Sequence, residues 1–233
     1  MLRVLDEYVD HMMDAGDRRE AHGGNDTSDI FASSRSRTRL IKGYQKRKDK
    51  KPIRKSRVGG SSIVITSYLV DRLKIGTLKF LAEKKINALA LDLPEYGKSS
   101  DTKKPATDSE KVDFIEKIIA NYSNVILVSP SKSGEYSIPF LKTLNSKLRG
   151  FISVAAGHTG ALNSEDFEQI DTRTLSVIGE LDSKSNKLGY ISVSNLKNLR
   201  HFKSVIIPNA GHACYMGHEE RFHQILYDFL SEL

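Results

Sequence analysis

The chain has 233 residues, of which 39% are hydrophobic, and these values favour one globular domain with a sizeable core. It contains no run of about 18 to 20 apolar residues, and its first twenty positions include acids throughout, which argues against a membrane span, a secretory signal or a transit peptide. The single cysteine, Cys214, cannot form an internal disulfide, so we expect a protein of the reducing cytoplasm.

The net charge of +7 is concentrated in one segment. Residues 35–57 hold 12 basic residues and one acid, a net charge of +11, whereas residues 1–34 carry −5 and residues 58–233 carry +1. We interpret this basic arm as a solvated tail, with a nuclear-import signal or a polyanion-binding arm as the alternatives. Apart from nonspecific contacts of the arm, we do not expect the protein to bind nucleic acid.

Two regions are predicted along the chain. Residues 1–57 are too polar to form a core and are expected to be largely disordered, whereas residues 58–233 alternate short apolar runs with helical stretches, as in βαβ units. The predicted strands are 62–66, 86–93, 124–129, 150–156, 174–179 and 203–208. The predicted helices are 73–85, 108–121, 133–145, 164–170, 188–199 and a last one that carries Phe222, Leu226, Phe229, Leu230 and Leu233. This order predicts an α/β fold whose mostly parallel sheet is covered by helices on both faces.

In such a sheet, functional groups gather at the carboxyl ends of the strands. The strand at 124–129 is followed by Pro130 and Ser131 and then by an apolar helix, which indicates a serine at a tight strand-to-helix turn. The usual nucleophile elbow is G-x-S-x-G, and here Ser129 and Ser133 occupy the glycine positions. The alternative is that these serines only cap the helix.

Two further strand ends carry an acid and a histidine. Asp182 follows the strand at 174–179, and His212 follows the strand at 203–208. The order Ser131, Asp182, His212 is the order of a serine hydrolase triad on this fold. Because an unassisted serine hydroxyl is a weak nucleophile, we expect His212 to act as the general base and Asp182 to orient it, with Glu180 as an alternative acid.

The same residues resemble the alpha/beta-hydrolase domain-containing protein 14 family. The matching segments are LALDLPEYGKS at 89–99, LVSPSKSGEYSIPFL at 127–141 and AGHACY at 210–215, and the serines in SPSKSG are the most specific part. The resemblance covers about residues 62–233, leans toward the soluble B form, and implies the alpha/beta-hydrolase fold with Ser131, Asp182 and His212 as the triad. It leaves the basic arm unexplained.

The resemblance also implies activity on short acyl esters and acetyl transfer from lysine to coenzyme A. It further implies a cytosolic and nuclear setting and a partner among the transcription-initiation factor subunits. We expect no permanently bound cofactor, coenzyme A being an acyl acceptor, and no metal, since no residues have metal-ligand spacing.

One feature departs from the family. The family follows its first parallel strand with a His-Gly pair that leads to the second oxyanion donor, whereas here Ser67 and Tyr68 follow that strand. We expect the first oxyanion donor at the Lys132 N–H and the second near Ser67 or Tyr68. The alternative function is a weak or inactive hydrolase-fold module that binds proteins linked to transcription. The short connection from Ala156 to Arg173 predicts an open site with no sizeable lid.

Overall fold

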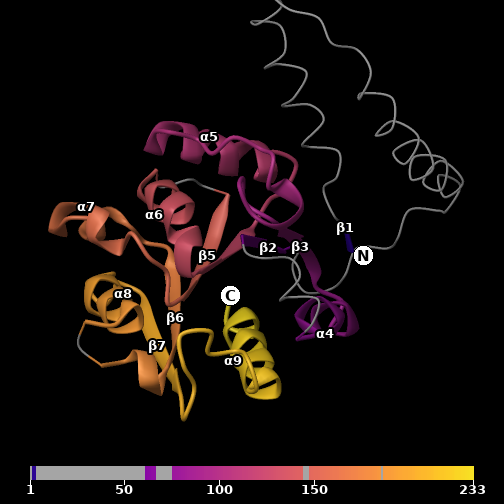
Figure 1. The fold of residues 1–233 in the computed structure, drawn as a ribbon, viewed down its shortest axis with the longest axis vertical. Coiled ribbons are helices and arrows are strands. Elements are labelled where there is room, and N and C mark those ends of the chain that lie inside the picture. Colours follow the sequence, from indigo (N-terminus) through magenta and orange to yellow (C-terminus); the bar gives the residue numbers. More distant parts are fainter. Residues whose placement is uncertain (1, 4–60, 67–74, 144–146, 185) are drawn as a thin grey trace, which may run out of the picture. The chain divides into compact units, whose positions relative to one another are not determined.

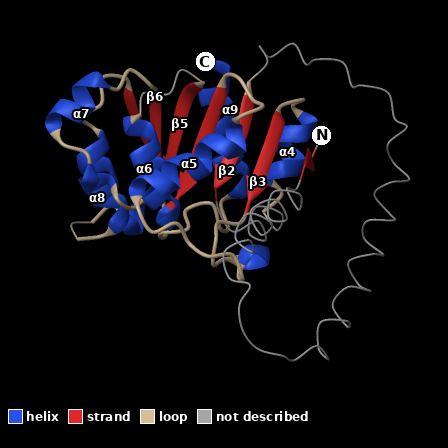
Figure 2. Ribbon diagram, turned by 90° about the horizontal axis from the view of Figure 1, so that it is seen from above, coloured by secondary structure: helices blue, strands red, loops and turns tan. Residues whose placement is uncertain are grey.

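Seven parallel strands form one sheet within the residues that the computed structural model describes, which are 2–3, 61–66, 75–143, 147–184 and 186–233. The strand order is β1-β3-β2-β4-β5-β6-β7, and Figure 2 shows the labelled strands β6, β5, β2 and β3 following one another across the sheet. The strands are β1 (Leu2–Arg3), β2 (Ser62–Thr66), β3 (Asn87–Leu91), β4 (Val125–Pro130), β5 (Leu148–Val154), β6 (Arg173–Gly179) and β7 (Phe202–Ile207).

The predicted parallel α/β fold is confirmed. Each of the six predicted strands is present, with both ends within two residues of the predicted ones. The strand β1 was not predicted, and it pairs with β3 through two residues, Leu2 opposite Ala88 and Arg3 opposite Leu89. The other residues of the predicted disordered region, with the whole basic arm, lie outside the described residues.

Helices cover both faces of the sheet, as the continuous apolar strands require. Figure 1 shows α5, α6, α7 and α8 on one side and α4 and α9 on the other. Their bounds are α4 (Thr77–Glu83), α5 (Asp108–Ile119), α6 (Gly134–Lys142), α7 (Ser164–Gln169), α8 (Leu188–Leu196) and α9 (Glu219–Ser231). No helix of the described part is both long enough and apolar enough to cross a membrane.

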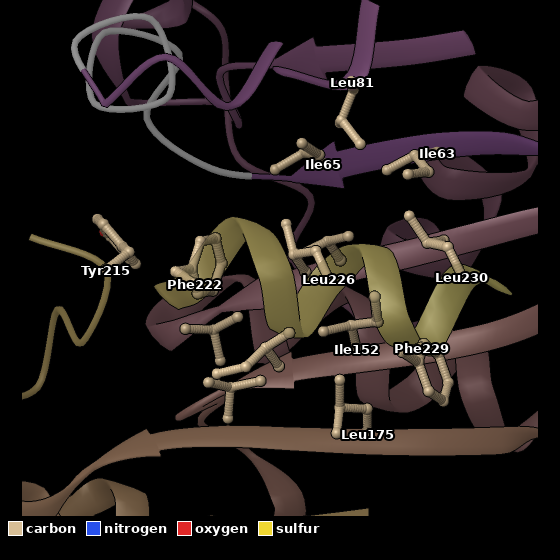
Figure 3. Packing of buried hydrophobic residues seen from close by; sticks show 14 of the residues in the cluster. Ile63, Ile65, Leu81, Ile152, Leu175, Tyr215, Phe222, Leu226, Phe229 and Leu230 are labelled. Atoms are coloured by element: carbon tan, nitrogen blue, oxygen red, sulfur yellow. The ribbon is translucent and has the colours of Figure 1, made fainter. Parts of the chain in front are cut away.

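The core between α9 and the sheet fixes the strands that carry the site. Phe222, Leu226 and Phe229 lie on one face of α9 because their spacing follows the helical period. They pack in one buried cluster with Ile152 of β5 and Leu175 of β6 (Figure 3). The packing of α9 therefore holds β5 and β6 in place, and with them the turns that follow these strands.

Short 3-10 turns follow three neighbouring strands at the carboxyl edge of the sheet. They are η3 (Ser131–Ser133) after β4, η4 (Thr159–Ala161) after β5 and η5 (Glu180–Asp182) after β6. The connection from β5 to β6 contains only η4 and the six-residue helix α7, in agreement with the expectation of no sizeable lid.

Candidate active site

The turn from β4 into α6 holds Ser131 in a strained backbone conformation. Ser131 follows Pro130 directly, and its φ of 48° lies in the left-handed region, which costs a residue other than glycine roughly 1–2 kcal/mol. Its carbonyl oxygen accepts a hydrogen bond of 2.7 Å from the Gly157 N–H in the loop after β5. Strain of this kind persists only where neighbouring contacts fix the backbone, as in a nucleophile elbow.

The two serines that replace the usual elbow glycines are both buried and hydrogen-bonded. Ser129 Oγ lies 2.5 Å from Ser137 Oγ of α6, and Ser133 Oγ donates to the Thr66 carbonyl at the end of β2. Ser133 immediately precedes α6 without capping it through its side chain, so the interpretation of these serines as simple helix caps is wrong. Their hydroxyls instead connect β4, α6 and β2 beside Ser131.

The close approach for which an elbow needs glycine occurs one residue later, at Gly134. A Cβ at this position would lie 2.0 Å from the Gly157 carbonyl oxygen and 2.7 Å from its carbon. Because these are backbone atoms, a side chain at Gly134 would push α6 away from the loop after β5. The sequence analysis missed this role, although the glycine that ends SPSKSG was visible.

The structure brings Ser131, His212 and Asp182 together from three separate strand ends. His212 Nε2 lies 2.9 Å from Ser131 Oγ, and His212 Nδ1 lies 2.8 Å from Asp182 Oδ2. These residues are 81 and 30 positions apart along the chain, so only the parallel sheet places them side by side. The result is one chain of hydrogen bonds from hydroxyl to imidazole to carboxylate.

Asp182 is buried at the inner end of this chain. Only 4% of the residue is exposed, and Oδ2 also accepts a hydrogen bond of 2.9 Å from the Gly189 N–H at the start of α8. A Cβ on Gly189 would lie 2.7 Å from both the carbonyl oxygen and Oδ2 of Asp182, so this position requires glycine. A buried carboxylate needs such donors, and Gly189 is a second residue that the sequence analysis missed.

The contacts of the imidazole assign its protons. An ionised Asp182 can only accept, so the hydrogen bond to it places a proton on Nδ1 of His212. In the neutral ring, Nε2 then carries the lone pair and faces the Ser131 hydroxyl. This tautomer is the one that can remove a proton from serine.

The structure describes one of the two expected oxyanion donors. Lys132 lies in the first turn of η3, where N–H groups have no partner within their own helix. Ser67 lies outside the described residues, which end at Thr66 on this side of the loop.

Charged side chains surround the elbow. Lys132 Nζ lies 5.9 Å from the centre of the Tyr96 ring, within the range of a cation–π contact. Lys104 and Glu135 form an ion pair at 2.5 Å beside the start of α6. The hydrogen bond between them lowers the pKa of the Glu135 carboxyl and raises the pKa of the Lys104 ammonium.

The alternative acid, Glu180, is directed to a different partner. Its Oε2 accepts a hydrogen bond of 2.8 Å from the Asn209 N–H, while Asp182 contacts the His212 ring.

His158 faces a different aspartate from the one that contacts His212. It has a φ of 62°, and its Nε2 lies 3.6 Å from Oδ2 of Asp108, the first residue of α5. Among the described residues, no group of three or more histidines, cysteines and acids could hold a metal ion.

Two solved structures with a similar fold carry the name of a hydrolase. A crystal structure titled as a predicted CIB-like hydrolase from Thermoplasma acidophilum matches 77% of this chain and 90% of its own, with a TM-score of 0.66 and 21% identity. An alpha/beta hydrolase from a metagenome of Mar Chica lagoon sediments matches 78% and 99%, with a TM-score of 0.60 and 18% identity. The chain therefore has the alpha/beta-hydrolase fold.

Relatives in sequence are closer. "Protein ABHD14A" of Mus musculus is 37% identical over 162 residues, which are 69% of this chain and 64% of the mouse protein. "Putative protein-lysine deacylase ABHD14B" of Rattus norvegicus is 36% identical over 163 residues, 68% of this chain and 76% of the rat protein. The chain belongs to the ABHD14 family.

The two forms are about equally similar to this chain, so the expected leaning toward the B form finds no support in these identities. The chain spans less than two thirds of the length of the mouse ABHD14A that it matches. No model of a protein family matches the chain.

Proposed function

We propose that this protein is a serine hydrolase that cleaves small acyl esters or amides through an acyl-enzyme on Ser131. The observation that carries the proposal is the hydrogen-bond chain of 2.9 Å and 2.8 Å from Ser131 through His212 to Asp182. The strained backbone at Ser131 supports it, because such strain is typical of a nucleophile elbow. The hydrolase fold supports it as well, because this elbow is the usual site of the nucleophile on that fold.

The proposed mechanism has two steps. In the first, Ser131 Oγ attacks the acyl carbonyl, His212 Nε2 takes the hydroxyl proton and then gives it to the leaving group, and an ester forms on Ser131. In the second, water or another acceptor attacks this ester, and the same imidazole moves the proton back. Asp182 stabilises the imidazolium, and the Lys132 N–H, with a second donor near Ser67, stabilises the oxyanion.

Within the part of the chain that the structure describes, the surroundings of Ser131 are open, which favours small or protruding acyl groups. The His212 side chain is 43% exposed, and the connection between β5 and β6 supplies no long cap over Ser131. An acylated lysine on a protein surface could therefore reach the hydroxyl.

The name of the rat relative supports the finer proposal that the substrate is an acyl-lysine. We propose that coenzyme A can replace water as the acceptor, its thiol taking the acyl group from Ser131 to give a thioester and free serine. A cytoplasmic or nuclear setting and a transcription-initiation factor partner belong to the same proposal and rest on the family resemblance alone.

The first experiment measures turnover of p-nitrophenyl acetate by the purified chain. We expect steady-state hydrolysis that Ser131→Ala abolishes, while Ser100→Ala, an exposed serine in another loop, leaves kcat unchanged. Absence of turnover in a folded chain would favour a non-catalytic binding module, for which the missing His-Gly pair is the specific observation. Acetyl-lysine peptides with and without coenzyme A then test the substrate and the acceptor.

A further inference from the structure

The imidazole of His212 is held by its loop more than by packing. Its side chain is 43% exposed, whereas its partner Asp182 is 6% exposed. The histidine loop, residues 208–213, is the first part of the connection from β7 to α9 and determines where the ring lies. The contacts of this loop backbone are therefore part of the catalytic geometry.

The histidine loop lies directly against the turn η5. The Leu181 N–H donates a hydrogen bond of 2.9 Å to the Ala210 carbonyl. A Cβ on Gly179 would lie 2.2 Å from the Gly211 carbonyl oxygen and 2.3 Å from that of Ala210, so the two backbones touch. A loop so close to its neighbour can move only if these contacts break.

The side chain of Glu180 adds a contact to the backbone of the histidine loop. Its Oε2 accepts the hydrogen bond of 2.8 Å from the Asn209 N–H, where the chain leaves β7. Asn209 has a φ of 58°, a left-handed conformation that asparagine tolerates better than most residues but that needs support from its neighbours.

The three-residue turn η5 thus contacts the histidine in two ways. Asp182 accepts from the ring, and Glu180 accepts from the backbone three residues before it. We infer that Glu180 is a positioning residue, which holds the turn at Asn209 so that the His212 imidazole stays aligned between Asp182 and Ser131. This inference deepens the proposed hydrolase function and rests on it.

Two variants separate the hydrogen bond of Glu180 from its charge. Glu180→Ala removes the acceptor, while Glu180→Gln keeps an oxygen that can accept from Asn209 and removes the charge. For p-nitrophenyl acetate, we expect Glu180→Ala to lower kcat about 5- to 10-fold with KM within about twofold, because the ring is misaligned while the open acyl site is unchanged. Glu180→Gln should stay within about twofold of the wild type in both constants.

A matched control is Glu110, which is also exposed and accepts a hydrogen bond of 3.0 Å from the Thr107 N–H at the start of α5. Glu110→Ala loses the same type of contact away from the triad and should leave kcat unchanged. A wild-type kcat for Glu180→Ala would overturn the inference, and so would an equal loss in Glu180→Gln, which would assign the effect to charge.

A second readout does not depend on turnover. In ¹⁵N spectra of the histidine rings at neutral pH, we expect the His212 signals of the wild type and Glu180→Gln to show the tautomer protonated at Nδ1, and those of Glu180→Ala to be averaged between tautomers. If the wild type has no Ser131-dependent turnover but this difference is present, the proposed function fails and the positioning role stands. Identical His212 signals in all three proteins, or failure of Glu180→Ala to fold, would contradict a role confined to positioning.

Discussion

The serine and the histidine of the site are held by opposite means. The residues that hold Ser131 in the elbow are buried, and they contact a strand, a helix and a loop: Ser133 contacts β2, Ser129 contacts α6, and Gly134 lies against the loop after β5. The histidine loop is exposed and is held by a few hydrogen bonds from the turn η5. We therefore expect substitutions in the elbow to change stability and activity together, whereas substitutions in the histidine loop should change mainly activity.

The largest effect is expected for His212→Ala. Without the general base, kcat for p-nitrophenyl acetate should fall by about 10⁴-fold or more, up to roughly 10⁶-fold. The melting temperature should fall by only about 2–4 °C, because the buried Asp182 loses the hydrogen bond from His212 but keeps the one from the Gly189 N–H.

His201→Ala is the matched control for that variant. His201 also pairs with an aspartate, Asp171, at 3.0 Å, but it precedes β7 and so lies at the other edge of the sheet. This variant should keep full activity. A His212→Ala protein that retains more than a tenth of the turnover would remove the general-base role.

The next largest effect is expected for Gly134→Ala, which tests whether stability and activity change together in the elbow. Gly134→Ala inserts a Cβ within 2.0 Å of a backbone oxygen, an overpacking that should cost about 1–3 kcal/mol and lower the melting temperature by about 3–10 °C. Movement of Ser131 by about 1 Å would lower kcat by up to roughly 100-fold.

Gly160→Ala controls for glycine replacement in general. Its Cβ would meet Asn195 Nδ2 at 3.8 Å, which is an ordinary contact, so melting and turnover should both be unchanged. If Gly134→Ala lost activity without any loss of stability, the contrast between elbow and histidine loop would be wrong.

A smaller effect is expected at Ser133. Ser133→Ala removes a buried hydrogen bond to the Thr66 carbonyl, at a cost of about 1 kcal/mol, or about 2–4 °C in melting temperature. Ser133→Gly restores the usual elbow residue but should be less stable still, because the φ of −59° at this position gives glycine no advantage and glycine gains more entropy on unfolding. A Ser133→Gly protein that melts above the wild type in a calorimetric scan would refute this.

The smallest expected effect is a pH dependence of the stability that Glu135 contributes. The hydrogen bond from Lys104 lowers the pKa of Glu135 in the folded state, so this group adds stability above the ordinary glutamate pKa of about 4.3, and the contribution is lost as the pH falls through the lowered value. Because both side chains are about one third exposed, solvent screens the pair. Glu135→Gln should melt about 1–2 °C below the wild type at pH 7, and the two melting curves should converge at acid pH.

The strands and the three triad positions could be predicted from the sequence because both follow from local patterns. Short apolar runs such as VILVS in β4 define strands, and parallel strands place their following residues at one common edge. Ser131 comes directly after such a run, Asp182 three positions after one and His212 five positions after one. Their meeting was therefore predictable without any knowledge of side-chain directions.

The contacts that hold these residues could not be predicted in the same way. Ser133 and Thr66 are 67 positions apart, and only the spacing of β2 and β4 decides whether the hydroxyl reaches the carbonyl. Gly134 and Gly189 are required because of backbone atoms on other segments. The strand β1 has two residues, too few for any periodic pattern to show.

The central claim is that Ser131 is a nucleophile activated by His212, and active-site labelling tests it most directly. The folded chain is incubated with a fluorophosphonate probe, and the modified peptide is located by mass spectrometry. We predict one adduct, on Ser131, that is absent in Ser131→Ala and forms far more slowly in His212→Ala. Correctly folded wild-type protein that carries no adduct on Ser131 would contradict the account.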